Sequence, residues 1–175
     1  VTLADAPLIL HREPELASRG FLSDDTLFAM LGFSSCVRID CSDYESVDEF
    51  FDLNQTESPP HLDQAFDVVL DAGTMEHVFD VANVLRHCSR LVRPGGRVIH
   101  LTPSSNCLEH GFYCVSPTLF ADFYTASEFD MNEVLLCRIP SSIERGAWRV
   151  YDYLKAGKDF IPMMGRLDRS VWFTF

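Results

Sequence analysis

The chain has 175 residues, a formal net charge of -12 and 14 lysines and arginines. These basic residues form no run or stripe, and a strongly negative protein repels phosphate, so the sequence argues against nucleic acid or an anionic membrane surface as partner. No apolar stretch approaches the roughly 20 residues of a membrane-spanning helix, and the first residues lack a signal-peptide pattern. We therefore expect a cytoplasmic protein with a single domain, residues 1–175.

Short elements are predicted in the first part of the chain. Val1–Leu10 is the candidate first strand, although Pro7 interrupts it. A helix is predicted to begin after Ser23, whose hydroxyl suits the cap position, and to end at Gly32. Val37–Asp40 is the predicted second strand, and it places a carboxylate at its carboxyl end.

A short aromatic strand and a polar loop are predicted next. Ser46–Leu53 is the candidate third strand, and Asp52 lies near its end. Gln55–Gln64 is polar and contains Pro59 and Pro60, which is typical of a surface loop rather than of a linker between domains.

The most regular pattern of the chain runs from Phe66 to Pro103. A continuous apolar run, Val68–Leu70, predicts a strand buried on both faces of a parallel sheet. Apolar residues then recur at helical spacing, a PGG turn stops the helix, and Arg97–Leu101 is the next strand. Such a strand–helix–strand crossover places ligands beyond the carboxyl ends of the strands. Two clusters are expected there, at Asp71–His77 and Thr102–His110.

The remaining elements follow a loop rich in polar and aromatic residues. Ser116 and Pro117 have the residue types of a helix cap and a first helical position, so a helix is predicted there. Glu133–Ile139 and Ser170–Phe175 are the last predicted strands. Between them, Arg145–Phe160 is predicted to be a helix or an ordered excursion over the sheet.

Three motifs of this chain, GTMEHVFD, PGGRVIHLTP and HGFYCVSPTLF, occur in this order. Together they resemble a bacterial small-molecule group of the class I S-adenosylmethionine-dependent methyltransferases, over roughly Gly32 to Arg138. The resemblance implies a Rossmann-like α/β fold: a mostly parallel sheet with an antiparallel edge and helices on both faces. It also implies S-adenosylmethionine as the cofactor and a methyl acceptor that is the hydroxyl or amine of a small molecule, such as a sugar or secondary metabolite.

The resemblance assigns cofactor contacts to the ends of three strands. Asp40 would bind the ribose hydroxyls, with Asp43 as the fallback and a helix cap by Ser42 or Asp43 as the structural alternative. The loop at Asp52 would face the adenine, although a turn-forming carboxylate explains that residue nearly as well. The full set of expected cofactor contacts is Asp40, Asp52, Leu53, Asp71, Ala72, Gly73 and Thr74.

Methyl transfer to a hydroxyl requires removal of a proton, and histidine suits that step near neutral pH. We expect His110 to be the base and His77 to line the site, whereas His100 lies inside a strand pattern and is assigned a structural role. A catalytic Glu76 competes with a helix start whose carboxylate complements the dipole. The residues expected to bind the acceptor are Glu76, Asn106, Phe112 and Tyr113. The alternative is that the HGFY motif only packs the loop onto the sheet, with His110 bonded to a backbone carbonyl.

Some features of the sequence differ from the family pattern. No glycine precedes Gly20, so the glycine-rich loop that usually follows the first strand is replaced by something bulkier or the true beginning is missing. This favours the alternative of a non-catalytic methyltransferase-like domain that serves as a partner or scaffold. A nicotinamide-dependent oxidoreductase would require GxGxxG, which the sequence lacks. The six cysteines show no metal-ligand spacing, so no metal is expected.

Overall fold

The computed structural model describes residues 23–43, 47–139, 149–155 and 171–174. The chain divides into two compact units, Val1–Phe51 and Asp52–Phe175, and each is described by itself. The predicted first strand, Val1–Leu10, lies outside the described residues. The assignment of residues 1–175 to one domain stays a prediction.

The unit Val1–Phe51 contains a helix and a small parallel sheet. Helix α2 spans Asp24–Met30, and the Ser23 hydroxyl accepts a hydrogen bond from the Thr26 backbone N–H at 3.2 Å, as the cap pattern predicted. Strands β1 (Ile39–Asp40) and β2 (Glu49–Phe50) pair in parallel. Both were expected from the sequence, and both are shorter than predicted.

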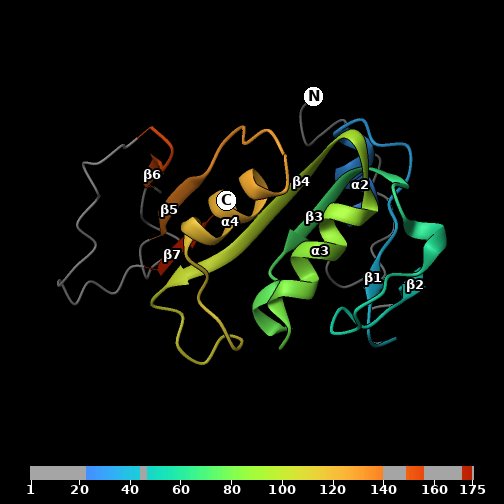
Figure 1. Ribbon diagram of the computed structural model, residues 1–175, viewed down its shortest axis with the longest axis horizontal. Helices are drawn as coiled ribbons and strands as arrows, with labels where there is room; N and C mark the ends of the chain where they lie inside the picture. The colour runs from blue at the N-terminus through green and yellow to red at the C-terminus, as the bar shows by residue number, and fades with distance from the viewer. Residues whose placement is uncertain (1–22, 44–46, 140–148, 156–170, 175) are drawn as a thin grey trace. The chain divides into compact units, whose positions relative to one another are not determined.

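The unit Asp52–Phe175 is built around a five-stranded sheet with the strand order β3-β4-β7-β5-β6 (Figure 1). Its first two strands are parallel to each other, and the remaining neighbours pair antiparallel. The elements of this unit are η2 (Pro60–Leu62), β3 (Phe66–Ala72), η3 (Met75–His77), α3 (Val81–Leu91), β4 (Val92–Ser105), α4 (Pro117–Ala126), β5 (Leu135–Ile139), β6 (Arg149–Asp152) and β7 (Val171–Thr174).

The predicted crossover is present as β3, α3 and β4. Helix α3 begins later than the pattern indicated, because a turn of 3-10 helix occupies Met75–His77 and Asp80 then caps α3 by accepting from the Asn83 N–H at 3.2 Å. The PGG segment also differs from the prediction, since β4 already begins at Val92 and includes it. Register shifts between Phe66 and Val68 accommodate the extra residues of β4.

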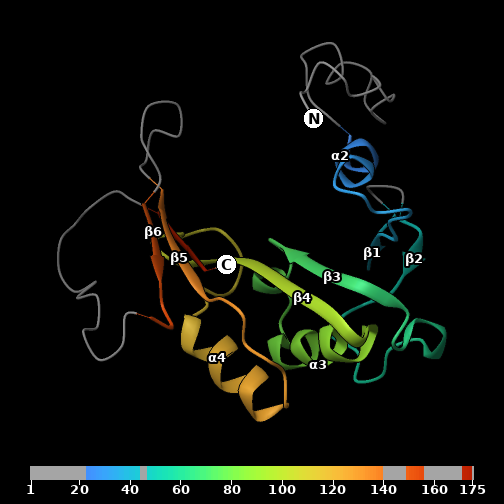
Figure 2. The ribbon, with the colours of Figure 1, turned by 90° about the horizontal axis from the view of Figure 1, so that it is seen from above.

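Helices α3 and α4 lie on the same face of the sheet (Figure 2). On that face Val69 and Val98 are paired in register and pack against the core. The next pair along the strands, Leu70 and Ile99, points the other way and is 46% and 45% exposed. The predictions of helices on both faces and of a strand buried on both faces are therefore wrong for the described residues of this unit, and β3 is an edge strand of the sheet rather than a central one.

The core of the unit lies between the sheet and the helices α3 and α4. Its buried members come from η3, from both helices and from the segment before α4: Met75, Val78, Val84, Leu85, Cys88, Val115, Phe120 and Tyr124. Helix α4 has the cap that the sequence predicted, with the Ser116 hydroxyl accepting from the Thr118 N–H at 3.3 Å. None of the helices among the described residues is long and apolar enough to cross a membrane.

The last strands are antiparallel, as expected of the edge, but three of the four neighbouring strand pairs of this sheet are antiparallel, so the prediction of a mostly parallel sheet is wrong for the described strands of this unit. β7 lies between β4 and β5 and is antiparallel to both. The segment expected to be a helix or excursion contains strand β6, at Arg149–Asp152, which pairs with β5.

Candidate active site

The site is built where the parallel strands β3 and β4 end. Their register places Asp71 beside His100 and Ala72 beside Leu101. After β3 the chain turns at Gly73, whose φ is +80° and whose N–H donates to the Leu101 carbonyl at 2.9 Å. The turn leads into η3, so Glu76 and His77 stand directly beside the end of β4.

Asp71 is the centre of a closed hydrogen-bond network. It is 6% exposed, and its Oδ1 accepts from the backbone N–H groups of Thr74 at 3.3 Å and Met75 at 3.1 Å. Its Oδ2 lies 2.6 Å from Nδ1 of His100, whose Nε2 lies 2.6 Å from the Tyr124 hydroxyl. A tautomer with the proton on Nδ1 satisfies both contacts of the imidazole. These contacts assign Asp71 a role in holding the turn, whereas its contact with a cofactor stays a prediction.

Glu76 is also buried, but it is poorly satisfied. Its side chain is 0% exposed, and its Oε2 accepts a hydrogen bond from the Thr102 hydroxyl at 3.1 Å. Its Oε1 has no hydrogen-bond partner among the residues that the structure describes. Helix α3 starts only at Val81, and Glu76 lies in the single turn of the 3-10 helix η3, so the helix start weighed as the structural alternative is present here as one short turn. Thr102 begins the second of the two clusters predicted from the sequence, but no role was assigned to it there.

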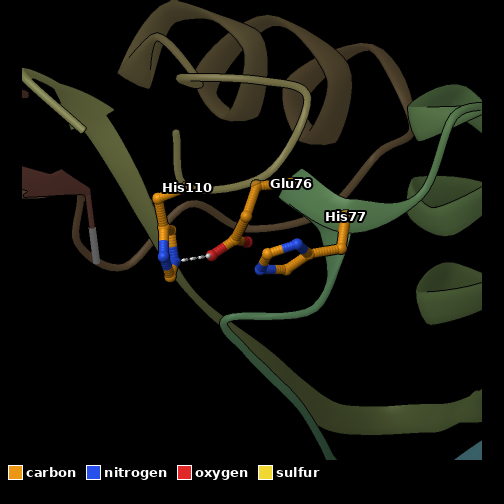
Figure 3. A group of neighbouring side chains, drawn as sticks. All are labelled: Glu76, His77 and His110. Atoms are coloured by element: carbon orange, nitrogen blue, oxygen red, sulfur yellow. Dashed lines mark ion pairs between the residues drawn. The ribbon is translucent and has the colours of Figure 1, made fainter. Parts of the chain in front are cut away.

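Two histidines flank the Glu76 carboxylate (Figure 3). His110 Nε2 lies 3.5 Å from Glu76 Oε1, and the rings of His77 and His110 are 5.0 Å apart in an edge-on arrangement. Figure 3 shows both rings directing a nitrogen toward the carboxylate. The structure therefore brings together the three residues Glu76, His77 and His110, which we call the Glu-His-His cluster.

The HGFY loop is attached to the turn of Glu76 by its backbone. The Glu76 carbonyl accepts from the N–H groups of Phe112 at 2.6 Å and Tyr113 at 3.3 Å. The Tyr113 hydroxyl donates to the Phe79 carbonyl at 2.9 Å, whereas the Phe112 side chain is 66% exposed. The loop thus packs onto the unit in part, as the alternative proposed, yet His110 faces a carboxylate rather than a backbone carbonyl.

The other predicted contacts of unit Asp52–Phe175 lie at the same end of the unit or near α3. Asp52 Oδ1 accepts from the backbone and the side chain of Asn54, both at 2.9 Å, and these hydrogen bonds lower the pKa of Asp52. Leu53 packs against the core. Asn106 is exposed and adopts a positive φ of 61° in the loop after β4. The turn-forming role weighed for Asp52 is thus present.

The remaining predicted cofactor contacts are Asp40 and the three residues that follow Asp71. Asp40, in the other unit, uses its Oδ1 to accept from the N–H and the hydroxyl of Ser42 at 2.7 and 2.9 Å, which makes it the carboxylate of a local turn. Ala72, Gly73 and Thr74 are exposed where β3 ends. Burial raises the pKa of the Cys107 thiol, which disfavours a reactive thiolate beside the site.

The methyltransferase-domain family model matches residues 36–98, from just before β1 into β4. Among curated proteins, the chain is similar to three ubiquinone biosynthesis O-methyltransferases. It is 29% identical to that of Pseudomonas syringae pv. tomato over 57% of this chain and 41% of the relative. It is 33% identical to that of Stutzerimonas stutzeri over 49% and 34%, and 35% identical to that of Pseudomonas aeruginosa over 47% and 34%. No solved structure gives a significant match.

The β3–α3–β4 crossover gathers polar side chains at its carboxyl edge, the edge at which open α/β sheets commonly bind small ligands. The match of residues 36–98 shows that this part of the chain is similar to the methyltransferase domain. The chain spans about two fifths of the length of the first of these relatives.

Proposed function

We propose that the protein transfers a methyl group from S-adenosylmethionine to the hydroxyl of a small molecule. The observation that supports this most is the position of the family match. It runs from just before β1 into β4 and so includes Asp40, Asp52, the turn after β3 and two members of the Glu-His-His cluster, Glu76 and His77. The relatives named above are O-methyltransferases of a small molecule, which favours oxygen over nitrogen as the accepting atom.

The residues present suit the cofactor chemically. S-adenosylmethionine carries ribose hydroxyls, an adenine amino group and a cationic sulfonium, and carboxylates can accept from the first two. In the unit Asp52–Phe175, Asp52 would take one of these roles through Oδ2, because among the described residues only its Oδ1 is used in a turn. The assignment of Asp40 to the ribose stays a prediction from the sequence. Gly73 would let the cofactor approach the backbone closely, since it is exposed and has no Cβ.

The acceptor would bind at the loop that follows β4. Phe112 offers an exposed flat face, and Asn106 an amide that both donates and accepts. S-adenosylmethionine would supply the methyl group: the acceptor oxygen would gain the O–CH3 bond, and sulfur would keep the electron pair of the broken C–S bond. The hydroxyl proton leaves toward the Glu-His-His cluster. The sequence-based assignment of His110 as the base stays a prediction.

Isothermal titration calorimetry with S-adenosylmethionine and with S-adenosylhomocysteine tests this proposal. We expect a one-to-one complex with a dissociation constant well below about 1 mM, the range in which a binding free energy exceeds about 4 kcal/mol. A folded protein that binds neither compound would refute the methyltransferase proposal and support the non-catalytic domain instead.

The acceptor class is tested separately. Incubation with isotopically labelled S-adenosylmethionine and a panel of catechols, phenols and sugars should transfer label to a hydroxyl-bearing member. The Phe112→Ala variant should weaken acceptor binding and leave cofactor affinity unchanged, because the ring is exposed and lies in the loop after β4. Equal loss of cofactor affinity would argue against an acceptor-specific role for that loop.

A further inference from the structure

The Glu76 carboxylate is buried with fewer hydrogen-bond donors than a buried charge needs. It is fully buried, and among the described residues its only hydrogen-bond donor is the neutral hydroxyl of Thr102. A buried carboxylate with one oxygen unsatisfied is costly unless a positive charge or a proton compensates it. In its own unit, Asp71 shows what a satisfied buried carboxylate looks like, with two backbone donors and an imidazole.

Nitrogen ligands surround the unsatisfied oxygen. His77 comes from η3 and His110 from the loop after β4, and both side chains are exposed. One candidate ligand atom from each of Glu76, His77 and His110 can be chosen so that all three lie within 4.8 Å of one another. Figure 3 shows the two rings converging on the carboxylate from different directions. An ion between them would meet one oxygen and two nitrogen atoms.

We propose that the Glu-His-His cluster binds a divalent first-row transition-metal ion such as Zn²⁺, through Glu76 Oε1 and one ring nitrogen each of His77 and His110. Two imidazoles and one carboxylate favour such an ion over Mg²⁺ or Ca²⁺, which take oxygen ligands. Metal–ligand bonds of about 2.0–2.2 Å place ligand atoms about 3.0–3.5 Å apart. The 3.5 Å between Glu76 Oε1 and His110 Nε2 already fits.

The backbone holds the cluster together. Gly111 has a φ of +75°, and a Cβ at that position would lie 2.6 Å from the Glu76 carbonyl oxygen. The same carbonyl accepts the Phe112 N–H at 2.6 Å. His110 is thus fixed beside Glu76 by its neighbours in the chain, while the exposed imidazoles keep the rotamer freedom to close the remaining distance around an ion.

Three protein ligands leave positions open, as in catalytic rather than structural metal sites. This part of the inference rests on the proposed function: the open positions would bind the acceptor oxygen and make its hydroxyl more acidic, and the proton would then pass to solvent because both histidines would be occupied as ligands. A metal-bound His110 is a ligand and not a general base. The metal proposal therefore predicts a role for His110 different from the one the sequence suggested.

The test is a titration of the full chain, freed of metal with a chelator, with Zn²⁺ by calorimetry and with Co²⁺ by visible absorption. We expect one ion per chain with a dissociation constant below about 10 µM and a Co²⁺ spectrum typical of nitrogen and oxygen ligands. His77→Ala, His110→Ala and Glu76→Gln should each weaken binding at least about tenfold. His61→Ala, an exposed histidine outside the cluster, is the matched control and should bind like the parent.

Two results would overturn the proposal: no stoichiometric binding below about 100 µM, or equal affinity in the parent and all three cluster variants. Folding of each variant is checked by circular dichroism, and the two exposed histidines tolerate truncation. Titration of the metal-free protein with S-adenosylhomocysteine separates the two proposals. Cofactor binding without metal binding removes only the metal site, whereas metal binding without cofactor binding removes only the methyltransferase proposal.

Discussion

The carboxylates of two carboxylate–histidine arrangements, Asp71 and Glu76, lie close together in the chain. The two arrangements differ in how many of their polar atoms have hydrogen-bond partners. Asp71, His100 and Tyr124 form a buried network in which each carboxylate oxygen and each ring nitrogen has a partner. In the Glu-His-His cluster the carboxylate is equally buried, but the histidines are exposed and one oxygen lacks a hydrogen bond. The first arrangement has the contacts of a structural element, whereas the second leaves a buried oxygen without a hydrogen bond among the described residues, which the proposed metal ion would satisfy.

The largest expected loss of stability comes from mutating the hydrogen-bond network of Asp71, His100 and Tyr124. Asp71→Ala leaves His100 buried without its acceptor and removes the acceptor of two backbone N–H groups, so the free energy of unfolding should fall by about 3–5 kcal/mol. Chemical denaturation measures it. Asp67→Ala on the same strand, at an exposed ion pair with Arg93, is the control and should cost less than about 1 kcal/mol. Equal losses would contradict the assignment of Asp71 to a structural network.

A second pair of variants tests how the loop is attached to the cluster. Gly111→Ala and Gly95→Ala both place a side chain at a positive φ, +75° and +79°, which costs about 1–2 kcal/mol. Only at Gly111 would the new Cβ meet the Glu76 carbonyl, at 2.6 Å, whereas nothing lies within 4 Å at Gly95. We expect Gly111→Ala to lose about 1–3 kcal/mol more than Gly95→Ala, by thermal or chemical denaturation. Equal losses of unfolding free energy in the two variants would mean that the loop can move away from the Glu76 carbonyl at little cost.

Tyr124→Phe removes one contact of the closed network and should lower the free energy of unfolding by about 1–2 kcal/mol near pH 7. Burial raises the pKa of Tyr124, so the folded state keeps this proton after the unfolded chain has lost it. Stability from this group is therefore fully present below about pH 10 and falls by up to about 1.4 kcal/mol per pH unit above it. Denaturation between pH 9 and about 11 should show the parent losing stability faster than Tyr124→Phe. Parallel curves would place Tyr124 outside the buried network.

The smallest expected effect has the opposite sign. Glu76→Gln replaces an unsatisfied buried charge with a neutral amide of similar shape that still accepts from Thr102. The metal-free protein should therefore gain about 0.5–1.5 kcal/mol in free energy of unfolding, measured with a chelator present. A loss comparable to that of Asp71→Ala would show that Glu76 belongs to a satisfied structural network after all.

Local patterns predicted the crossover and the helix caps well. The apolar run before Asp71, the helical spacing that follows and the capping residues at Ser23 and Ser116 each act within a few residues, so the sequence displays them directly. Burial of the second face of the sheet was wrong, because an apolar run alone does not determine what covers it.

The sequence predicted the two histidines of the cluster as site residues, but it did not predict that the Glu76 carboxylate would be buried. Its burial depends on the loop around Gly111, which follows it by more than thirty positions in the chain and covers it through hydrogen bonds to its carbonyl. The pairing of Asp71 with His100 likewise depends on strand register. Such contacts between distant segments leave no periodic signal in the sequence.

The hydrogen bonds from Phe112 and Tyr113 to the Glu76 carbonyl have a consequence for engineering. A change of acceptor made by transplanting residues 104–113 from another enzyme would separate that loop from the turn on which it was selected to rest. Recombination that moves residues 71–79 and 104–113 as a pair would keep their shared backbone contacts. If the loop binds the acceptor as proposed, the segments 71–79 and 104–113 would have to be exchanged together to change the acceptor, with β4 between them kept as scaffold.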